Sequence, residues 1–403
     1  MIDSAHPSTF RNLGAFEYII DLYISRNPVQ FSIAIELTAR VVPEDVVKAL
    51  VAVQRAHPML MARIDRTDVL PAFRRGGSPV PLRILDTDDW VAVSGAEQAT
   101  PIDPGAGPLL RAAYVARPEG DAFPVVILTF SHQIADGRGA LRAVRDLLEA
   151  LEGRALAAQP LPASQEELLA SMPDAPASPA NAPATPTSER AMAEVRPFDG
   201  IAPTIEIAAL DRRRTAHLRD RARTEGATVQ GVLCAAVAQV LCERGTPGSI
   251  RINVPIDLRS AAGLPDAVVN RFTATTIELG DPTARDLWSL ARDATNQLRA
   301  GRSTARAAAL MLASLHSADA GEAEAAMLAA TNADVEITNL GVLETMSDAA
   351  SAVWGPTMVT QVRHERIMGV VTFDGSLRLT VTGHDDVVGV AAAIGSRLTT
   401  DGA

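Results

Sequence analysis

The feature that most constrains this chain is a strand-to-helix junction that carries a histidine. Residues 123–130 (FPVVILTF) are nearly all apolar or β-branched, which is typical of a strand buried on both faces. The run ends at residues 131–137 (SHQIADG), and beyond them apolar residues recur at the spacing of one helix face. These residues are Ala140, Leu141, Val144, Leu147, Leu148 and Leu151. A buried strand followed by a covering helix predicts layers of helices and sheets, with the junction's polar side chains at a sheet edge.

Two domains are predicted on either side of a segment rich in alanine, proline and serine. The chain has 403 residues, of which 47% are hydrophobic and 21% charged, and this length and composition suit two full-sized cores. We predict an N-terminal domain at 1–155, a linker or flexible crossing at 156–200, and a C-terminal domain at 201–403. Strand and helix patterns mix in both halves, so the predicted class is α/β (α+β).

Further elements are predicted in both halves from hydrophobic spacing. Strand patterns occur at 31–37, 204–208, 249–256, 335–338, 359–362 and 377–382. Helical patterns occur at 43–56, 211–224, 228–244, 284–298 and 305–328. The charge-free apolar stretch 226–242 is marginal in length for a membrane span and contains two glutamines, so it predicts a buried core helix and no membrane span.

Charge and cysteine usage narrow the class of protein. The formal net charge of −11 argues against nucleic acid as the main partner. Cys234 and Cys242 lie in an apolar helical stretch without a C-x-x-C pair, which fits a reducing compartment. The first residues lack the basic and apolar regions of a signal peptide, so a cytoplasmic protein is expected. Residues 384–386 (HDD) lack a convincingly spaced third ligand, and no metal site is predicted.

The histidine at the junction is the candidate for proton transfer, because imidazole is best suited to that task near neutral pH. Beyond His132, Gly137 and Gly139 allow a tight turn and the close approach of a substrate. Amides at the start of the helix are suited to a developing negative charge, and Asp136 is a candidate N-cap. Arg142 replaces the third glycine of a dinucleotide-binding loop, and neither a G-x-S-x-G nor a Walker motif is present. Rossmann, α/β-hydrolase and P-loop chemistry are therefore disfavoured.

Residues 131–137 resemble the H-H-x-x-x-D-G motif of the thioester-dependent acyltransferase superfamily. That superfamily includes nonribosomal peptide condensation domains, chloramphenicol acetyltransferase, plant BAHD acyltransferases and polyketide-associated acyltransferases. Ser131 replaces the first histidine, and His132 keeps the second. Other segments follow the family's order: 13–17 (LGAFE) is similar to L-S-x-x-E, 54–60 (QRAHPML) to R-H-P-x-L, and 253–259 (NVPIDLR) to P-x-D-L-R. Residues 338–341 (TNLG) resemble the S-N-L-G stretch of the polyketide-associated and alcohol acetyltransferase branch, and the plant branch's D-F-G-W-G is absent.

The resemblance spans nearly the whole chain and implies two chloramphenicol-acetyltransferase-like domains with a solvent channel between them. His132 is implied to lie midway along the channel as the general base. It would serve the transfer of an acyl group from a thioester to an acceptor hydroxyl, without a covalent acyl-enzyme. Asp136 is implied to point away from the substrate and to pair with Arg259 in a structural role, while Gly137 gives the turn its room.

The resemblance also implies the substrates, with no tightly bound cofactor. The donor is a thioester of coenzyme A or of an acyl carrier protein, and the acceptor is a small alcohol or amine. Ser131, Gly139 and Asn339 are candidates for lining the channel or meeting the oxyanion. Arg213 and Arg214 lie on a basic helix and are candidates for binding the donor's phosphates, the simpler interpretation being a solvated helix face.

Two alternatives stay open at this point. One is condensation-type amide-bond formation between two carrier-bound substrates. The other is a non-catalytic, condensation-like binding protein, for which the loss of the first motif histidine leaves room. A monomer is expected in either case.

Overall fold

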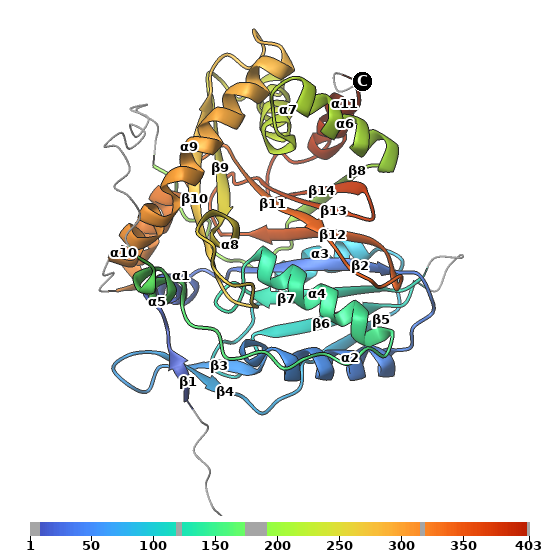
Figure 1. The fold of residues 1–403 in the computed structure, drawn as a ribbon, viewed down its shortest axis with the longest axis vertical. Helices are drawn as coiled ribbons and strands as arrows, with labels where there is room; N and C mark the ends of the chain where they lie inside the picture. Colours follow the sequence, from blue (N-terminus) through green and yellow to red (C-terminus); the bar gives the residue numbers. More distant parts are fainter. Residues whose placement is uncertain (1–8, 118–122, 174–191, 315–318, 401–403) are drawn as a thin grey trace, which may run out of the picture.

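The computed structural model describes residues 9–117, 123–173, 192–314 and 319–400, which form two lobes of mixed helices and sheets (Figure 1). A five-stranded sheet forms the centre of the first lobe, and a six-stranded sheet forms the centre of the second. The α/β class expected from the sequence is confirmed. A small sheet, β1 (Thr9–Asn12), β4 (Ala72–Arg75) and β3 (Ala62–Asp65), flanks the first lobe.

The first lobe is a sheet with helices on both faces. Its strand order is β12 (Ala350–Val359), β2 (Gln30–Leu37), β7 (Val125–Ser131), β6 (Leu110–Val115) and β5 (Leu82–Leu85). The amphipathic helices α2 (Pro43–Ala56) and α4 (Gly137–Leu151) pack their apolar stripes on one face, in the main core of the lobe. On the other face, α3 (Trp90–Gln98) places Trp90 against Trp354 of β12. The strand β7, with helices on both sides, is buried throughout, as its continuous apolar run predicts.

The second lobe is also built around a sheet, which has six strands. Its strand order is β10 (Phe272–Leu279), β9 (Ile250–Asp257), β11 (Val335–Leu343), β13 (Ile367–Phe373), β14 (Ser376–Gly383) and β8 (Thr204–Leu210). Its helices are α6 (Arg212–Thr224), α7 (Val229–Glu243), α8 (Leu258–Ala261), α9 (Leu287–Ser314), α10 (Ala320–Ala330) and α11 (Val390–Thr400). The core helix is α7, which was predicted from its charge-free sequence and is buried along most of its length.

The strand β12 joins the two lobes. It comes from the C-terminal half of the sequence but runs antiparallel to β2 in the sheet of the first lobe, with Met358 opposite Phe31. The predicted boundary near residue 200 therefore separates the two sheets except for this strand. The sequence pattern gave only a short strand at 359–362, whereas the strand spans 350–359, because its glycine and proline residues obscure the alternation.

The segment after α4, part of the predicted linker or crossing, is held to the first lobe by hydrogen bonds. Residues 156–173 run along the first lobe and include the short helix α5 (Gln165–Ser171). Gln159 N–H donates to Ala56 O at 2.8 Å, and the Glu166 carboxylate accepts from Phe16 N–H at 2.9 Å. These contacts tie the segment down despite its proline content. The remaining part of the predicted linker lies partly at 174–191, outside the described residues.

The two helices predicted at 284–298 and 305–328 are instead the long helix α9 (Leu287–Ser314) and the separate α10 (Ala320–Ala330). Gly301, in the gap between the two predicted helices, lies inside α9. A Cβ atom there would approach the side chain of Thr275 on β10 to 2.6 Å, so the glycine permits close packing on the sheet. Among the described residues, no single helix has both the length and the apolar character to span a membrane. Within this described part of the chain, one sharply bent pair of helices, α6 and α7, meets those criteria jointly.

Candidate active site

The end of β7 presents His132 at the boundary between the lobes. His132 N–H donates to Val29 O at 3.3 Å. Because Val29 immediately precedes β2, this bond holds the turn against the start of the neighbouring strand. The helix α4 begins five residues later at Gly137. Because β7 and α4 are both packed into the core of the first lobe, the turn between them is fixed at each end.

The carboxylate of Asp136 links this turn to the second lobe. Its Oδ1 accepts from Gly139 N–H at 2.7 Å as the N-cap of α4. Its Oδ2 accepts from Arg259 Nη1 at 2.8 Å and from Arg271 N–H at 2.7 Å. Burial alone raises the pKa of Asp136, but Arg259 and the two backbone donors outweigh it and hold the pKa below its ordinary value. Asp136 is thus an ionised strut between the lobes, and the capping and pairing contacts expected from the sequence coexist.

The strut is extended by residues between β9 and β10. Arg259 Nη2 also donates to Ala267 O and Val269 O, each at 2.9 Å. Asn270 Nδ2 donates to His132 O at 2.7 Å, so the second lobe holds the backbone of the histidine itself. Asn270 carries no recognisable sequence signal, because its partner lies 138 residues away.

Aromatic rings enclose the imidazole of His132. The ring of Phe31 meets it edge-on at 5.3 Å between centroids, and the ring of Phe272 lies at 5.5 Å. His132 Nδ1 is buried without a hydrogen-bond partner. Burial lowers the pKa of His132 below its ordinary value near 6.5, more than the nearby Asp136 raises it. The imidazole is therefore neutral at pH 7 and able to accept a proton.

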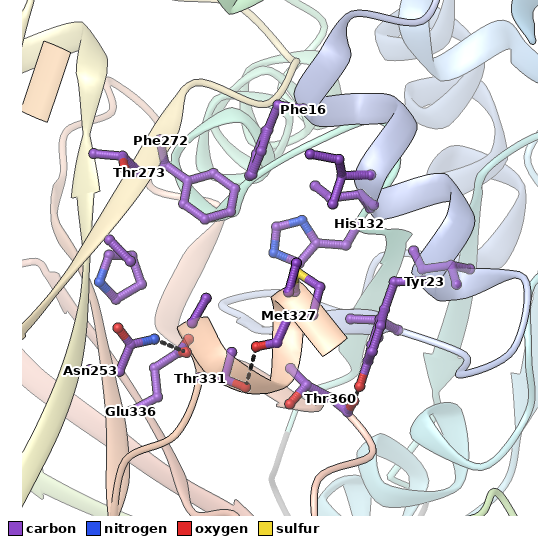
Figure 2. Close-up of a pocket in the computed structure, with 18 of the residues that line it drawn as sticks. Phe16, Tyr23, His132, Asn253, Phe272, Thr273, Met327, Thr331, Glu336 and Thr360 are labelled. Carbon is purple, nitrogen blue, oxygen red and sulfur yellow. Dashed lines mark hydrogen bonds between the residues drawn. The ribbon is translucent and has the colours of Figure 1, made fainter. Parts of the chain in front are cut away.

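Two cavities meet at His132. The first, here called the apolar cavity, has about 960 Å³ of empty space including its mouth. Side chains of α1 (Ala15–Ile24) and of α10 form much of its wall, among them Ile19 and Met327. Figure 2 shows the His132 ring at this cavity, near Phe272, with Asn253 and Glu336 across the space.

The second space, here called the polar cavity, has about 580 Å³ of empty space including its mouth. Gly137 and Arg138 at the start of α4 line it, together with Thr338 and Asn339 of β11. His132, Pro255, Phe272, Glu336 and Met358 line both cavities. The histidine thus lies where an apolar and a more polar chamber adjoin.

The candidate lining residues fall into two groups. Gly137 and Asn339 line the polar cavity, and a Cβ atom on Gly137 would approach Leu340 Cδ2 to 2.3 Å. Ser131 and Gly139 line neither cavity beside His132. The Ser131 hydroxyl donates to Gln133 Oε1 at 2.8 Å, and the N–H of Gly139 is engaged by Asp136. Neither of these two is placed to meet an oxyanion, contrary to the sequence-based expectation.

The arginines proposed to bind the donor's phosphates lie elsewhere. Arg213 and Arg214 are exposed at the start of α6, on the outer side of the second lobe (Figure 1). Neither lines a cavity that contains His132. Arg214 lies 3.9 Å from Asp211, the N-cap residue of its own helix. Their placement fits a solvated helix face.

Two polar residues of the site were missed by the sequence reasoning. Glu336 of β11 lines both cavities, and Asn253 of β9 lines the apolar one. Asn253 Nδ2 donates to Glu336 Oε2 at 2.9 Å. Asn253 belongs to the motif segment 253–259, and Glu336 lies two residues before the segment 338–341. The one sequence signal for them was that each is a polar residue between apolar neighbours in a strand.

No group of three or more metal-ligating side chains occurs in the described part of the chain. The HDD segment at 384–386 follows β14, and its Asp385 lies 3.4 Å from the exposed His364. Both of these side chains are largely exposed.

Known proteins with a similar sequence segment or a similar fold were compared with the chain. Residues 201–382 match the family model described as phthiocerol/phthiodiolone dimycocerosyl transferase C-terminus. No curated protein sequence matches the chain. Among solved structures, polyketide synthase associated protein 5 from Mycobacterium tuberculosis is 18% identical, with a TM-score of 0.66 over 98% of each chain.

Two further structures show the same fold at similar distance. The first condensation domain of the calcium-dependent antibiotic synthetase, in complex with a substrate analogue, is 16% identical, with a TM-score of 0.68 over 97% of each chain. A trichothecene 15-O-acetyltransferase from Fusarium sporotrichioides is 14% identical, with a TM-score of 0.65 over 97% of this chain and 95% of that one. The chain therefore shares the two-lobed fold of these proteins, and the match over residues 201–382 agrees with the resemblance of its motifs.

Proposed function

We propose that the protein is an acyltransferase that moves an acyl group from a thioester to an acceptor hydroxyl, with His132 as the general base. The observation that carries the proposal is the position of the His132 imidazole at the junction of an apolar and a polar cavity. Burial lowers the pKa of His132, which favours the neutral form that can accept a proton. The donor is a thioester of coenzyme A or of an acyl carrier protein. The family match to a transferase C-terminus and the fold shared with an O-acetyltransferase support this chemistry.

The apolar cavity suits the acyl chain of the donor. Its wall consists largely of aliphatic and aromatic side chains from α1 and α10, such as Ile20, Phe16 and Ala330. Burying each methylene of an acyl chain there is worth about 0.8 kcal/mol. The polar cavity, on the other side of His132, then receives the acceptor.

The proposed reaction needs one proton carrier. Neutral His132 takes the proton from the acceptor hydroxyl as its oxygen attacks the thioester carbonyl and forms the new C–O bond. The carbonyl becomes an oxyanion, the C–S bond then breaks, and protonated His132 returns the proton to the leaving thiolate. Positioned base catalysis of this kind contributes roughly 10²–10⁴-fold to the rate.

The start of α4 supports the charge that develops on the carbonyl oxygen. Gly137, the first residue of the helix, lines the polar cavity, where the positive end of the helix dipole acts. A well-placed oxyanion donor is worth about 3–4 kcal/mol. Asp136 holds this helix start in place by capping Gly139.

Acceptor-dependent thiol release tests the proposal. Purified protein is given octanoyl-coenzyme A or the same acyl group on a phosphopantetheinylated carrier protein, with and without a panel of small alcohols and amines. We expect free thiol to appear with an alcohol and the product to be an ester that hydroxylamine cleaves. A hydroxylamine-stable amide instead indicates condensation-type chemistry. Thiol release from neither donor with any acceptor would favour a non-catalytic binding protein.

A further inference from the structure

A second titratable group, the carboxyl group of Glu336, faces the site beside His132. Glu336 lies on β11 and lines both the apolar and the polar cavity. Its Oε2 accepts from Asn253 Nδ2 at 2.9 Å, and its Oε1 accepts from Thr338 Oγ1 at 3.0 Å. The proposed acyl transfer assigns no task to this carboxyl group.

No cation in the described part of the chain forms an ion pair with Glu336. Arg138, the basic residue that lines the polar cavity, is exposed and donates to Leu340 O at 2.6 Å instead. Burial raises the pKa of Glu336, since only the neutral donors of Thr338 and Asn253 oppose it. The carboxyl lies deep in the molecule and keeps exposed surface only because it faces the cavities. A deep carboxylate without a cation is costly unless a ligand supplies one.

A neighbouring side chain has unused hydrogen-bonding capacity at the same place. Asn253 lies opposite Glu336 in the pairing of β9 with β11, is 4% exposed and lines the apolar cavity. Asn253 donates its amide group to Glu336, which leaves Asn253 Oδ1 buried without a partner. Buried polar atoms are rarely left unsatisfied, so this oxygen beside a carboxyl group without a cation indicates a missing ligand group.

We propose that Glu336 and Asn253 form a subsite for an ammonium group of the acceptor substrate. The two side chains offer a carboxylate and an amide oxygen, both of which can accept hydrogen bonds. A primary ammonium group carries one positive charge and three N–H donors, so it matches the carboxylate in charge and can donate to both groups. Because Glu336 lines both cavities, an acceptor in the polar cavity can reach it with its ammonium group. The substrate class that follows is an amino alcohol.

The inference rests on the proposed acyl transfer and refines it. An ammonium group that is held by a carboxylate keeps its proton and is no nucleophile. The hydroxyl group of the same molecule is then the group that reaches His132. The subsite therefore favours ester formation on an acceptor that also contains an amine.

A kinetic comparison tests the subsite with a matched set of acceptors. Linear amino alcohols from aminoethanol to aminohexanol are compared with alcohols that carry a methyl group in place of the ammonium group. Octanoyl-coenzyme A is the donor for the wild type and for Glu336→Gln. We expect Glu336→Gln to lower kcat/KM for the preferred amino alcohol roughly 10–100-fold, as the loss of a charged hydrogen bond predicts. The matched plain alcohol should change less than about threefold, because it makes no such bond.

Glu365→Gln is the control variant. Glu365 is also a deep carboxyl group with a raised pKa, but it lines neither cavity and accepts from Thr360 and Val362. We expect this variant to keep the preference for amino alcohols. If Glu336→Gln lowers kcat/KM equally for both acceptor types, or leaves the preference intact, the subsite is not an ammonium site.

A binding measurement separates this inference from the proposed reaction. Titration calorimetry with the same amino alcohols on His132→Ala protein needs no turnover. We expect binding that weakens roughly 10–100-fold when Glu336→Gln is added. Such binding without any thiol release from wild type would keep the subsite and reject the acyl transfer. Thiol release to plain alcohols, with amino alcohols bound no better than their methyl analogues, would reject the subsite alone.

Discussion

Removal of the Asp136 carboxylate is expected to destabilise the protein strongly. The side chains of Asp136 and Arg259 are each 7% exposed, so Asp136→Ala leaves a buried guanidinium without its closest partner. Breaking such a pair costs about 3–5 kcal/mol, and the lower end applies because Asp257 Oδ1 and two carbonyl oxygens remain near Arg259. The buried amides of Gly139 and Arg271 also lose their acceptor, at about 1 kcal/mol or more each.

We therefore expect Asp136→Ala to lower the free energy of unfolding by about 5 kcal/mol. Urea unfolding, followed by circular dichroism and by tryptophan fluorescence, measures the change. Asp266→Ala is the matched control. Asp266 also lies near Arg259, at 3.4 Å, but its side chain is 48% exposed, so the expected cost is below about 1 kcal/mol.

A double-mutant cycle completes the test. Asp136→Ala combined with Arg259→Met removes both charges, so the double variant should lose clearly less stability than the two single losses added together. A loss below about 1 kcal/mol for Asp136→Ala, or simple additivity in the cycle, would refute the strut between the lobes.

Three other predictions follow from the structure. Burial raises the pKa of Glu365 to about 7 from its ordinary 4.5, so the folded chain keeps a proton that the unfolded chain releases. Stability is therefore lost as the pH rises from 4.5 to 7, by about 3 kcal/mol at about 1.4 kcal/mol per pH unit. Urea unfolding at several pH values should show this loss in the wild type but not in Glu365→Gln. If the free energy of unfolding changed with pH equally in both proteins, the prediction would be wrong. Reversal of Arg213 and Arg214 to glutamate should leave the KM for octanoyl-coenzyme A unchanged, and a raised KM would restore their donor-binding role. Gly231→Ala should destabilise the second lobe by about 1–3 kcal/mol, because its Cβ would lie 2.5 Å from Ala291 O; an unchanged unfolding midpoint would count against this packing.

The sequence was sufficient for the parts of the site that depend on local patterns. The apolar run before His132 identifies β7, because a strand buried on both faces is apolar at every position. The helical spacing after Gly137 identifies α4, because a helix buried on one face has apolar residues every three or four positions. The pairing of Asp136 with Arg259 came through the family resemblance rather than from spacing, since the two residues are 123 positions apart. Only the structure shows which atoms make the contact, namely Arg259 Nη1 and Asp136 Oδ2.

Other features depend on contacts that no local pattern encodes. The helix α9 continues through Gly301 because the glycine packs on Thr275, a residue of another element. The strand β12 pairs with the opposite lobe, which hydrophobic alternation cannot reveal. Glu336 looks like an ordinary polar residue on a strand until both cavities are seen to include it. Propensity and periodicity identify elements, whereas tertiary packing decides which of their polar faces meet.

The proposed acyl transfer depends on the imidazole of His132 as the carrier of the proton. The most direct measurement is the rate of acceptor-dependent thiol release from octanoyl-coenzyme A, or from the matching carrier-protein thioester, by wild type and by His132→Ala. Circular dichroism and urea unfolding establish that the variant is folded. We predict a native fold with the rate lowered by about 10²–10⁴-fold. A folded His132→Ala protein with a rate close to that of wild type would contradict the account.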